Sequence, residues 1–170
     1  MCDVAFRVQR IPSSDEWRAW LDAHTAKLLL YARQQTRSIA DAEDVLQDAL
    51  IDSWQKAGHQ APPLPLVFAT IRRRAIDQAR SNDRRARREQ TDESEPWFAP
   101  EIEPRDHQRL LEDAVKSLTP IYREVITLKV WGGLTFREIA ETIGVPLNTA
   151  ASRYRYALDE LRSLLKEVQP

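Results

Sequence analysis

Six polar side chains near the C-terminal end have the types and the spacing to bind nucleic acid. Asn148, Ser152 and Arg155 follow one another at intervals of four and three residues, which places them on one face of a helix. Arginine and asparagine can form paired hydrogen bonds with base edges in the major groove, and short polar side chains can reach phosphates. With the residues that flank this face, the candidate DNA contacts are Asn148, Thr149, Ser152, Arg153, Arg155 and Tyr156.

The elements around these side chains have the spacing of a helix-turn-helix. Thr135 is suited to cap a short helix, Gly144 to end it, and Pro146 to start a longer helix that continues to about residue 168. Two helices joined by such a tight turn are typical of DNA-binding proteins. An ordinary solvated helix in an all-helical domain is the alternative. The longer helix should pack against the rest of its domain through a stripe formed by Ala150, Tyr154, Ala157, Leu158 and Leu161.

An arginine-rich segment is a second candidate surface for nucleic acid. Residues 72–88 contain eight arginines and two aspartates, and residues 89–106, which follow directly, contain seven acids and one arginine. Cationic side chains on a helix can neutralise phosphates. A solvated basic surface, or pairing with the acidic segment, would also account for the charge run taken alone. The presence of a DNA-reading motif in the same chain favours the nucleic-acid interpretation.

A predicted helix over residues 41–56 carries a row of acids opposite its apolar face. Acids in the first turn of a helix complement the helix dipole, which accounts for Asp41 to Asp44. The dipole does not account for Asp48 or Asp52, which lie further along the helix.

Helical periodicity organises the chain into two all-α parts joined by a linker. A Ser-x-x-Glu capping box at Ser13 opens the first helix. Residues at helical spacing form a stripe along one face of this helix, and the stripe is expected to be buried except for its two polar members, Tyr31 and Gln35. A loop over residues 58–65 precedes the arginine helix, which starts at about Leu66. The inward face of that helix is expected to be Val67, Phe68, Ile71, Ala75 and Ala79. Three such helices with short connections form a small bundle.

The predicted domains are residues 1–88, an acidic linker over residues 89–106, and a second helical domain over residues 107–170. The linker contains prolines and has no helical period, which favours a flexible, extended segment. In the second domain, Thr119 is expected to cap a helix that has Pro120 at its first position.

Composition and scattered residues argue against several classes of protein. The single cysteine, Cys2, cannot form an internal disulfide, so a cytoplasmic protein is expected. No apolar run approaches the length of a membrane span, and the N-terminus lacks a signal-peptide core. The histidines His24, His59 and His107 are scattered, and the chain has no phosphate-binding glycine loop. No enzyme activity, metal or cofactor is therefore expected.

Three ordered stretches resemble the extracytoplasmic-function (ECF) class of bacterial RNA polymerase sigma factors. They are "DAEDVLQDALIDSW", "TIRRRAIDQAR" and "LTPIYREVITLKVWGGLTFREIAETIGVPLNTAASRYRYALDEL", and the resemblance extends from about His24 to Leu165. It implies that residues 1–88 form sigma region 2 and residues 107–170 form sigma region 4. It also implies that the chain binds core RNA polymerase, directs it to promoter DNA and promotes DNA opening.

The resemblance assigns a role to each candidate surface. The acidic helix would dock on the polymerase clamp, the loop over residues 58–65 would shape a pocket for a flipped-out base, and region 4 would read the minus-thirty-five element through the six polar residues named above. The implied polymerase contacts are Asp41, Glu43, Asp44, Gln47 and Asp48. The implied minus-ten contacts are Arg72, Arg73, Arg74, Arg80 and Arg84. The acidic linker would occupy the nucleic-acid channel of the polymerase.

This chain departs from the usual family pattern at a few positions. Arg74 stands where members usually have asparagine, and the pair Val67–Phe68 stands where they usually have Trp-Leu. In the recognition helix, Ala151 replaces a usual lysine and Tyr156 a frequent arginine. These changes bear on the promoter consensus more than on the role.

One alternative function and one further partner are also considered. A stand-alone helix-turn-helix regulator would account for the C-terminal half but leaves the acidic and arginine helices without a function. Many members of the family are held inactive by an anti-sigma factor, and such a protein is a possible partner of this chain.

Overall fold

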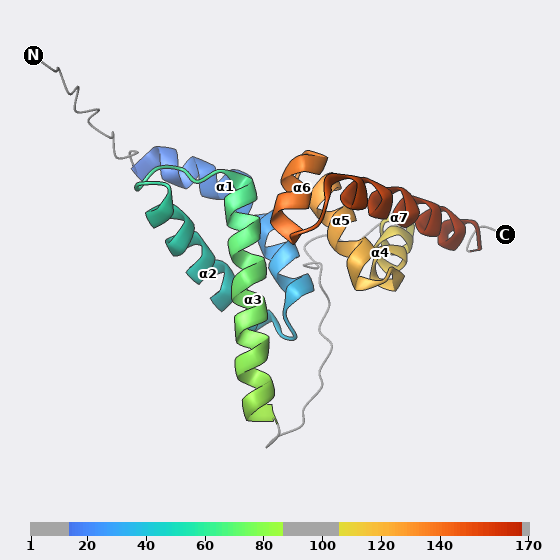
Figure 1. Ribbon diagram of the computed structural model, residues 1–170, viewed down its shortest axis with the longest axis horizontal. Helices are drawn as coiled ribbons and strands as arrows, with labels where there is room; N and C mark the ends of the chain where they lie inside the picture. The colour runs from blue at the N-terminus through green and yellow to red at the C-terminus, as the bar shows by residue number, and fades with distance from the viewer. Residues whose placement is uncertain (1–13, 87–105, 168–170) are drawn as a thin grey trace, which may run out of the picture.

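The computed structural model describes the backbone of residues 14–86 and 106–167, and this part of the chain is helical apart from its turns (Figure 1). The capping residue Ser13, the thiol of Cys2 and most of the predicted linker lie outside the described residues. The helices of the described part are α1 (Ser14–Gln35), α2 (Ile39–Lys56), α3 (Leu64–Ala86), α4 (Asp106–Ser117), α5 (Pro120–Val130), α6 (Phe136–Ile143) and α7 (Leu147–Glu167).

Helices α1, α2 and α3 pack against one another and form the N-terminal bundle. Helix α2 starts two residues before its predicted position because Ser38 caps it, its Oγ accepting a hydrogen bond of 3.0 Å from the backbone N–H of Asp41. The apolar residues of α2 recur at helical spacing, so one side of the helix enters the core. Its buried residues are Ala42, Val45, Leu46, Ala49 and Ser53.

Two burial predictions for this bundle are wrong. Tyr31, expected outside the buried stripe of α1, is completely buried and lies edge-on to Phe68, with 5.2 Å between ring centroids. A tyrosine can be buried in this way when its hydroxyl finds a partner, and Tyr31 donates a 2.8 Å hydrogen bond to Glu124 of α5. Ala79, expected to face inward, is exposed.

Helices α4 to α7 form the C-terminal bundle, in which local signals fix the helix ends. Thr135 and Glu138 form a capping box at the start of α6, and Gly144 ends α6 with a positive φ of 71°. Thr119 is the N-cap of α5 and Pro120 its first residue, as predicted, although the threonine side chain makes no capping hydrogen bond. Arg123 satisfies carbonyls at the C-terminal end of α4 and just after it, by donating to the backbone oxygens of Val115, Lys116 and Leu118.

The stripe of α7 is buried only in part. Ala150, Ala157 and Leu161 are buried, whereas Tyr154 and Leu158 are half-buried.

The turn between α5 and α6 contains two glycines, and each position favours glycine for a different physical reason. A Cβ on Gly132 would lie 2.5 Å from the carbonyl oxygen of Leu128, whereas Gly133 has open space but a φ of 70°.

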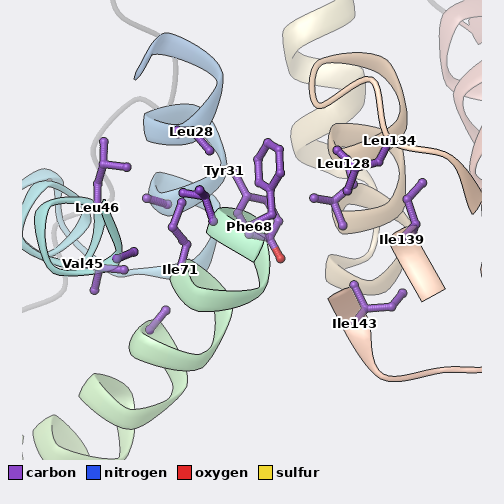
Figure 2. Packing of buried hydrophobic residues seen from close by; sticks show 14 of the residues in the cluster. Leu28, Tyr31, Val45, Leu46, Phe68, Ile71, Leu128, Leu134, Ile139 and Ile143 are labelled. Atoms are coloured by element: carbon purple, nitrogen blue, oxygen red, sulfur yellow. The ribbon is translucent and has the colours of Figure 1, made fainter. Parts of the chain in front are cut away.

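The two bundles are packed together, although the sequence indicated only a flexible connection between them. Helix α6 lies on α3, and α5 contacts α1. One hydrophobic core therefore continues from Tyr31, Phe68 and Ile71 into Leu128 and Ile139 (Figure 2). A second, smaller core joins α4, α5 and α7 alone, around Leu118, Ile126 and Ala157.

Candidate polymerase and nucleic-acid interfaces

Four of the five predicted polymerase contacts form an exposed surface on α2. The side chains of Glu43, Asp44, Gln47 and Asp48 are exposed, and they lie opposite the buried face of the helix. Asp41 is different, because it is half-buried and its Oδ1 accepts a 2.7 Å hydrogen bond from Gln78 Nε2 of α3. Asp41 therefore joins α2 to α3, and the accessible part of the acidic surface begins at Glu43.

Asp52, which the helix dipole did not explain, binds the arginines of α3. Its Oδ2 accepts hydrogen bonds from Arg74 Nε at 3.0 Å and from Arg73 Nη2 at 3.2 Å. The hydrogen bond from Arg74 holds the pKa of Asp52 below its ordinary value and raises the pKa of Arg74. Asp48 adds a weaker contact, 3.9 Å from Arg74. This cluster orients Arg73 and Arg74 on the surface shared by α2 and α3.

The predicted minus-ten arginines do not form a uniform row along α3. Arg73 and Arg74 pair with Asp52, whereas Arg72 Nε donates a 3.0 Å hydrogen bond to Glu124 in the other bundle. Arg80 is exposed, further along the helix. Helix α3 includes position 84, but the side chain of Arg84 lies outside the described residues.

The loop between α2 and α3 is shorter than predicted. It ends at residue 63, because α3 begins at Leu64 and Pro65 lies in its first turn, where proline has no hydrogen bond to lose. His59 has a positive φ of 62°, and its ring lies edge-on to Trp54 with 4.3 Å between centroids. A half-buried tryptophan and an exposed histidine thus stand together at the start of this loop.

The predicted recognition helix α7 presents polar side chains on its outer face. Asn148, Arg155 and Tyr156 are exposed, and Thr149, Ser152 and Arg153 are half-buried. The guanidinium carbon of Arg155 lies 5.2 Å from the ring centroid of Tyr156, which supports the arginine from one side. Ser152 Oγ donates to the carbonyl oxygen of Asn148 at 2.8 Å.

Sequence reasoning missed a set of polar residues at the contact between the bundles. One oxygen of Glu124, Oε1, accepts hydrogen bonds from both Tyr31 and Arg72, and Thr127 Oγ1 donates a 2.8 Å hydrogen bond to Gln34 Oε1. Burial and the neighbouring carboxylate raise the pKa of Tyr31 well above its ordinary value, so the phenol keeps its proton and remains a donor. Each partner lies more than fifty residues from the other in sequence, and no local spacing rule links them.

The described part of the chain offers no group of three or more His, Cys, Asp or Glu side chains that could hold a metal ion. None of its helices is long and apolar enough to cross a membrane.

Comparisons with known proteins match both halves of the chain. The model described as Sigma-70 region 2 matches residues 20–85, and the one described as Sigma-70, region 4 matches residues 108–161. The ECF RNA polymerase sigma factor SigL of Mycobacterium tuberculosis is 34% identical over 158 residues, covering 89% of each chain. The ECF RNA polymerase sigma factor RpoE of Cereibacter sphaeroides is 35% identical over 130 residues, or 72% of this chain and 71% of that protein.

The fold is also found among solved structures. The sigma factor RpoE of Bartonella quintana, solved in complex with the anti-sigma factor NepR, matches with a TM-score of 0.71 at 24% identity and covers 93% of this chain and 100% of that chain. The two family models lie on the two helical bundles, in the order that the sequence motifs indicated. The chain therefore belongs to the ECF sigma factors, the initiation factors that bind core RNA polymerase and direct it to promoters.

Proposed function

We propose that this sigma factor recognises the minus-thirty-five element through the outer face of α7. The observation that carries the proposal is that α7 has one face exposed to solvent and another face buried in the bundle. Asn148 and Arg155 face solvent while Ala150 and Ala157 are buried against the rest of the bundle. A helix held in this way can enter the major groove without losing its packing. Thr149, Ser152, Arg153 and Tyr156 flank the two exposed residues and complete the proposed set.

The proposed polymerase contact is the exposed acidic surface of α2. Glu43, Asp44, Gln47 and Asp48 provide carboxylates and an amide that a basic surface of the polymerase clamp could bind. Charge complementarity of this kind speeds association and selects the partner. Asp41 supports the surface from the interior through Gln78.

The proposed minus-ten contacts are the arginines of α3. Arg73 and Arg74 keep donors available beyond their bonds to Asp52, since a guanidinium has five N–H groups. Arg80 and Arg84 would extend the contact along the helix, and the Trp54–His59 pair would form one wall of the pocket for a flipped-out base. We assign residues 1–88 to region 2, residues 89–106 to the linker and residues 107–170 to region 4.

Sigma factors in general are not enzymes, and we propose that this chain acts by binding alone, in the cytoplasm. An anti-sigma factor is a proposed additional partner. Two proteins of similar fold support this proposal: the sigma factor RpoE of Bartonella quintana was solved with the anti-sigma factor NepR, and CnrH was solved with the cytosolic domain of CnrY. This support rests on a likeness of fold, and a pull-down from cells that express the tagged chain tests it.

The experiment that tests the main proposal is transcription by core polymerase and this protein on genomic DNA, followed by sequencing of the transcript starts. Shared sequence elements are expected near minus ten and minus thirty-five of the starts. Changing Asn148 and Arg155 together to alanine should abolish preference in the upstream element and leave the downstream element intact. Loss of preference in the downstream element instead would overturn the assignment of α7.

A further inference from the structure

One carboxylate oxygen on α2 holds two neighbouring arginines of α3. Asp52 Oδ2 accepts hydrogen bonds from Nε and Nη2 of Arg74 and a third, of 3.2 Å, from Arg73 Nη2. Successive residues of a helix lie about 100° apart around its axis, so the shared acceptor brings both side chains to the side of α3 that packs on α2. The two guanidinium groups therefore have a common anchor.

The anchor is shielded from solvent more than the groups that it holds. The side chain of Asp52 is 21% exposed, whereas those of Arg74 and Arg73 are 38% and 52% exposed. A partly buried ion pair is screened less by salt than one on the open surface, and hydrogen bonds between charged groups are the stronger kind. The bonds thus fix the direction of each arginine while part of each guanidinium stays open to solvent.

The bonds to Asp52 leave donors for a second partner. A guanidinium has five N–H groups, of which Asp52 receives one from Arg73 and two from Arg74. An arginine whose direction is fixed in advance loses less freedom on binding, so a correct contact is favoured over other contacts. A mobile arginine also pairs with any phosphate within reach, and phosphate contacts carry no sequence information.

This anchor departs from the usual sigma-factor pattern. Arg74 stands where ECF sigma factors usually have asparagine, which is shorter and has no charge to pair with an aspartate. Asp48 adds a second carboxylate, 3.9 Å from Arg74 Nη1. The direction of the arginines on α3 is therefore set by ion pairs in which this chain differs from that pattern.

We propose that Asp52 is a positioning residue for minus-ten recognition. It holds Arg73 and Arg74 in the direction in which they meet the DNA, and thereby sharpens the preference for the sequence of that element. Asp52 acts through the two arginines and makes no contact with DNA itself. This inference rests on the proposed role of α3 as the minus-ten contact. Removal of the carboxylate charge should cost discrimination between sequences more than it costs binding.

The test is transcription by core polymerase and the full chain from a promoter library randomised in the minus-ten element. Asp52→Asn leaves a neutral acceptor of the same size, which holds the arginines less firmly. Sequence preference should fall by between about twofold and tenfold, the change expected when one long side chain must be ordered on binding. Asp52→Glu keeps the charge and should retain most of the preference. Preference in a second library, randomised in the minus-thirty-five element, should not change.

A matched control separates orientation from charge. The hydrogen bond to Asp52 is the main cause that raises the pKa of Arg74, and the charge of Asp77 adds to it. Asp77 is exposed and lies about one turn after Arg73. Asp77→Asn therefore removes an equal charge near the arginines and should leave the minus-ten preference unchanged. Circular dichroism and competition for core polymerase check that both variants fold and dock as the wild type does.

A double-mutant cycle shows through which residues Asp52 acts. In a chain that carries Arg73→Ala and Arg74→Ala, Asp52→Asn should cause no further change in preference, because the side chains that it positions are gone. A further loss as large as that in the wild-type background would overturn the proposal.

The remaining outcomes distinguish the positioning role from the role of α3. Unchanged minus-ten preference in folded Asp52→Asn would overturn the positioning role, as would an equal loss of transcription from all library members, which a merely structural role predicts. If Arg73→Ala with Arg74→Ala alters the preference and Asp52→Asn does not, only the positioning role fails. If the double arginine variant also leaves the preference unchanged, the proposed minus-ten role of these arginines fails with it.

Discussion

Asp52 of α2 and Arg74 of α3 form a hydrogen-bonded ion pair, with Arg74 Nε 3.0 Å from the aspartate Oδ2. Arg74 is one of the departures from the usual family pattern, and this contact gives it a structural role. The pair fixes the rotation of α3 relative to the acidic helix. It therefore determines where Arg73 and the exposed acids of α2 stand with respect to each other.

The stability that this pair contributes should depend on pH. The pKa of Asp52 is lower in the folded chain than in the unfolded one, so its contribution is complete above the unfolded value and is lost as the pH falls through the folded value. Thermal melts of wild type should therefore show a loss of stability below about pH 4, the ordinary range of an aspartate. Asp52→Asn should reduce that loss relative to wild type. An identical pH profile in the two proteins would contradict the assignment.

The acidic surface of α2 should govern binding to core polymerase. Asp44→Lys combined with Asp48→Lys reverses two exposed charges, so affinity for the core should fall by about tenfold or more, which corresponds to about 1.4 kcal/mol. A competition assay against labelled wild-type sigma factor measures this, and circular dichroism checks helix content. Asp22→Lys, at an exposed position on α1, is the control that should leave affinity unchanged. Equal affinities of the two variants would exclude α2 as the docking surface.

The arginines of α3 should act in promoter opening. Arg73→Ala with Arg80→Ala leaves the Arg74–Asp52 pair intact, and should reduce opening of duplex promoters more than it reduces core binding. A template with a pre-opened bubble should restore most transcription, because the cost of melting has been removed. Arg18→Ala, at an exposed position on α1, is the charge control. If the bubble gives no rescue, these arginines act at another step.

Arg155 and Leu161 should separate DNA reading from folding in α7. Arg155→Ala removes an exposed side chain and should cost roughly 1–3 kcal/mol of discrimination at one base pair if the contact is to a base edge. Leu161 is buried, so Leu161→Ala should instead lower the free energy of unfolding by about 2–5 kcal/mol. Leu158→Ala should cost less than Leu161→Ala, because Leu158 is only half-buried. A randomised minus-thirty-five library and thermal melts measure the two effects. A folded Arg155→Ala protein with unaltered sequence preference would contradict the proposal that the outer face of α7 reads the DNA sequence.

The two adjacent glycines between α5 and α6 should respond differently to alanine. Gly132→Ala puts a Cβ 2.5 Å from a backbone oxygen, and should cost about 1–3 kcal/mol because the backbone has to shift. Gly133→Ala has room, so its cost is that of a positive φ, about 1–2 kcal/mol. Denaturant titration of both variants gives these values. A neutral Gly132→Ala would show that the turn relaxes at no cost.

Sequence reasoning succeeded where the determining interactions are local. The cap at Thr135, the helix end at Gly144 and the exposed acids after Asp41 follow from spacing rules that act within a turn or two. It failed for Tyr31, which was expected outside the buried stripe, since the hydroxyl is satisfied by Glu124 from a distant helix. The partners of Arg72 and Asp52 were missed for the same reason, because the charge of a segment does not reveal which long-range pair each side chain forms.

The core shared by the two bundles has a consequence for folding cooperativity. One buried cluster contains Leu128, Ile139 and Ile143 of the C-terminal bundle together with Leu28, Phe68 and Ile71 of the N-terminal bundle. Unfolding of either bundle therefore exposes apolar side chains of the other to water. The free chain should consequently melt in a single calorimetric transition, with equal van't Hoff and calorimetric enthalpies. In Glu124→Ala, which removes the hydrogen bonds that Tyr31 and Arg72 donate across the contact, that transition should broaden or divide into two.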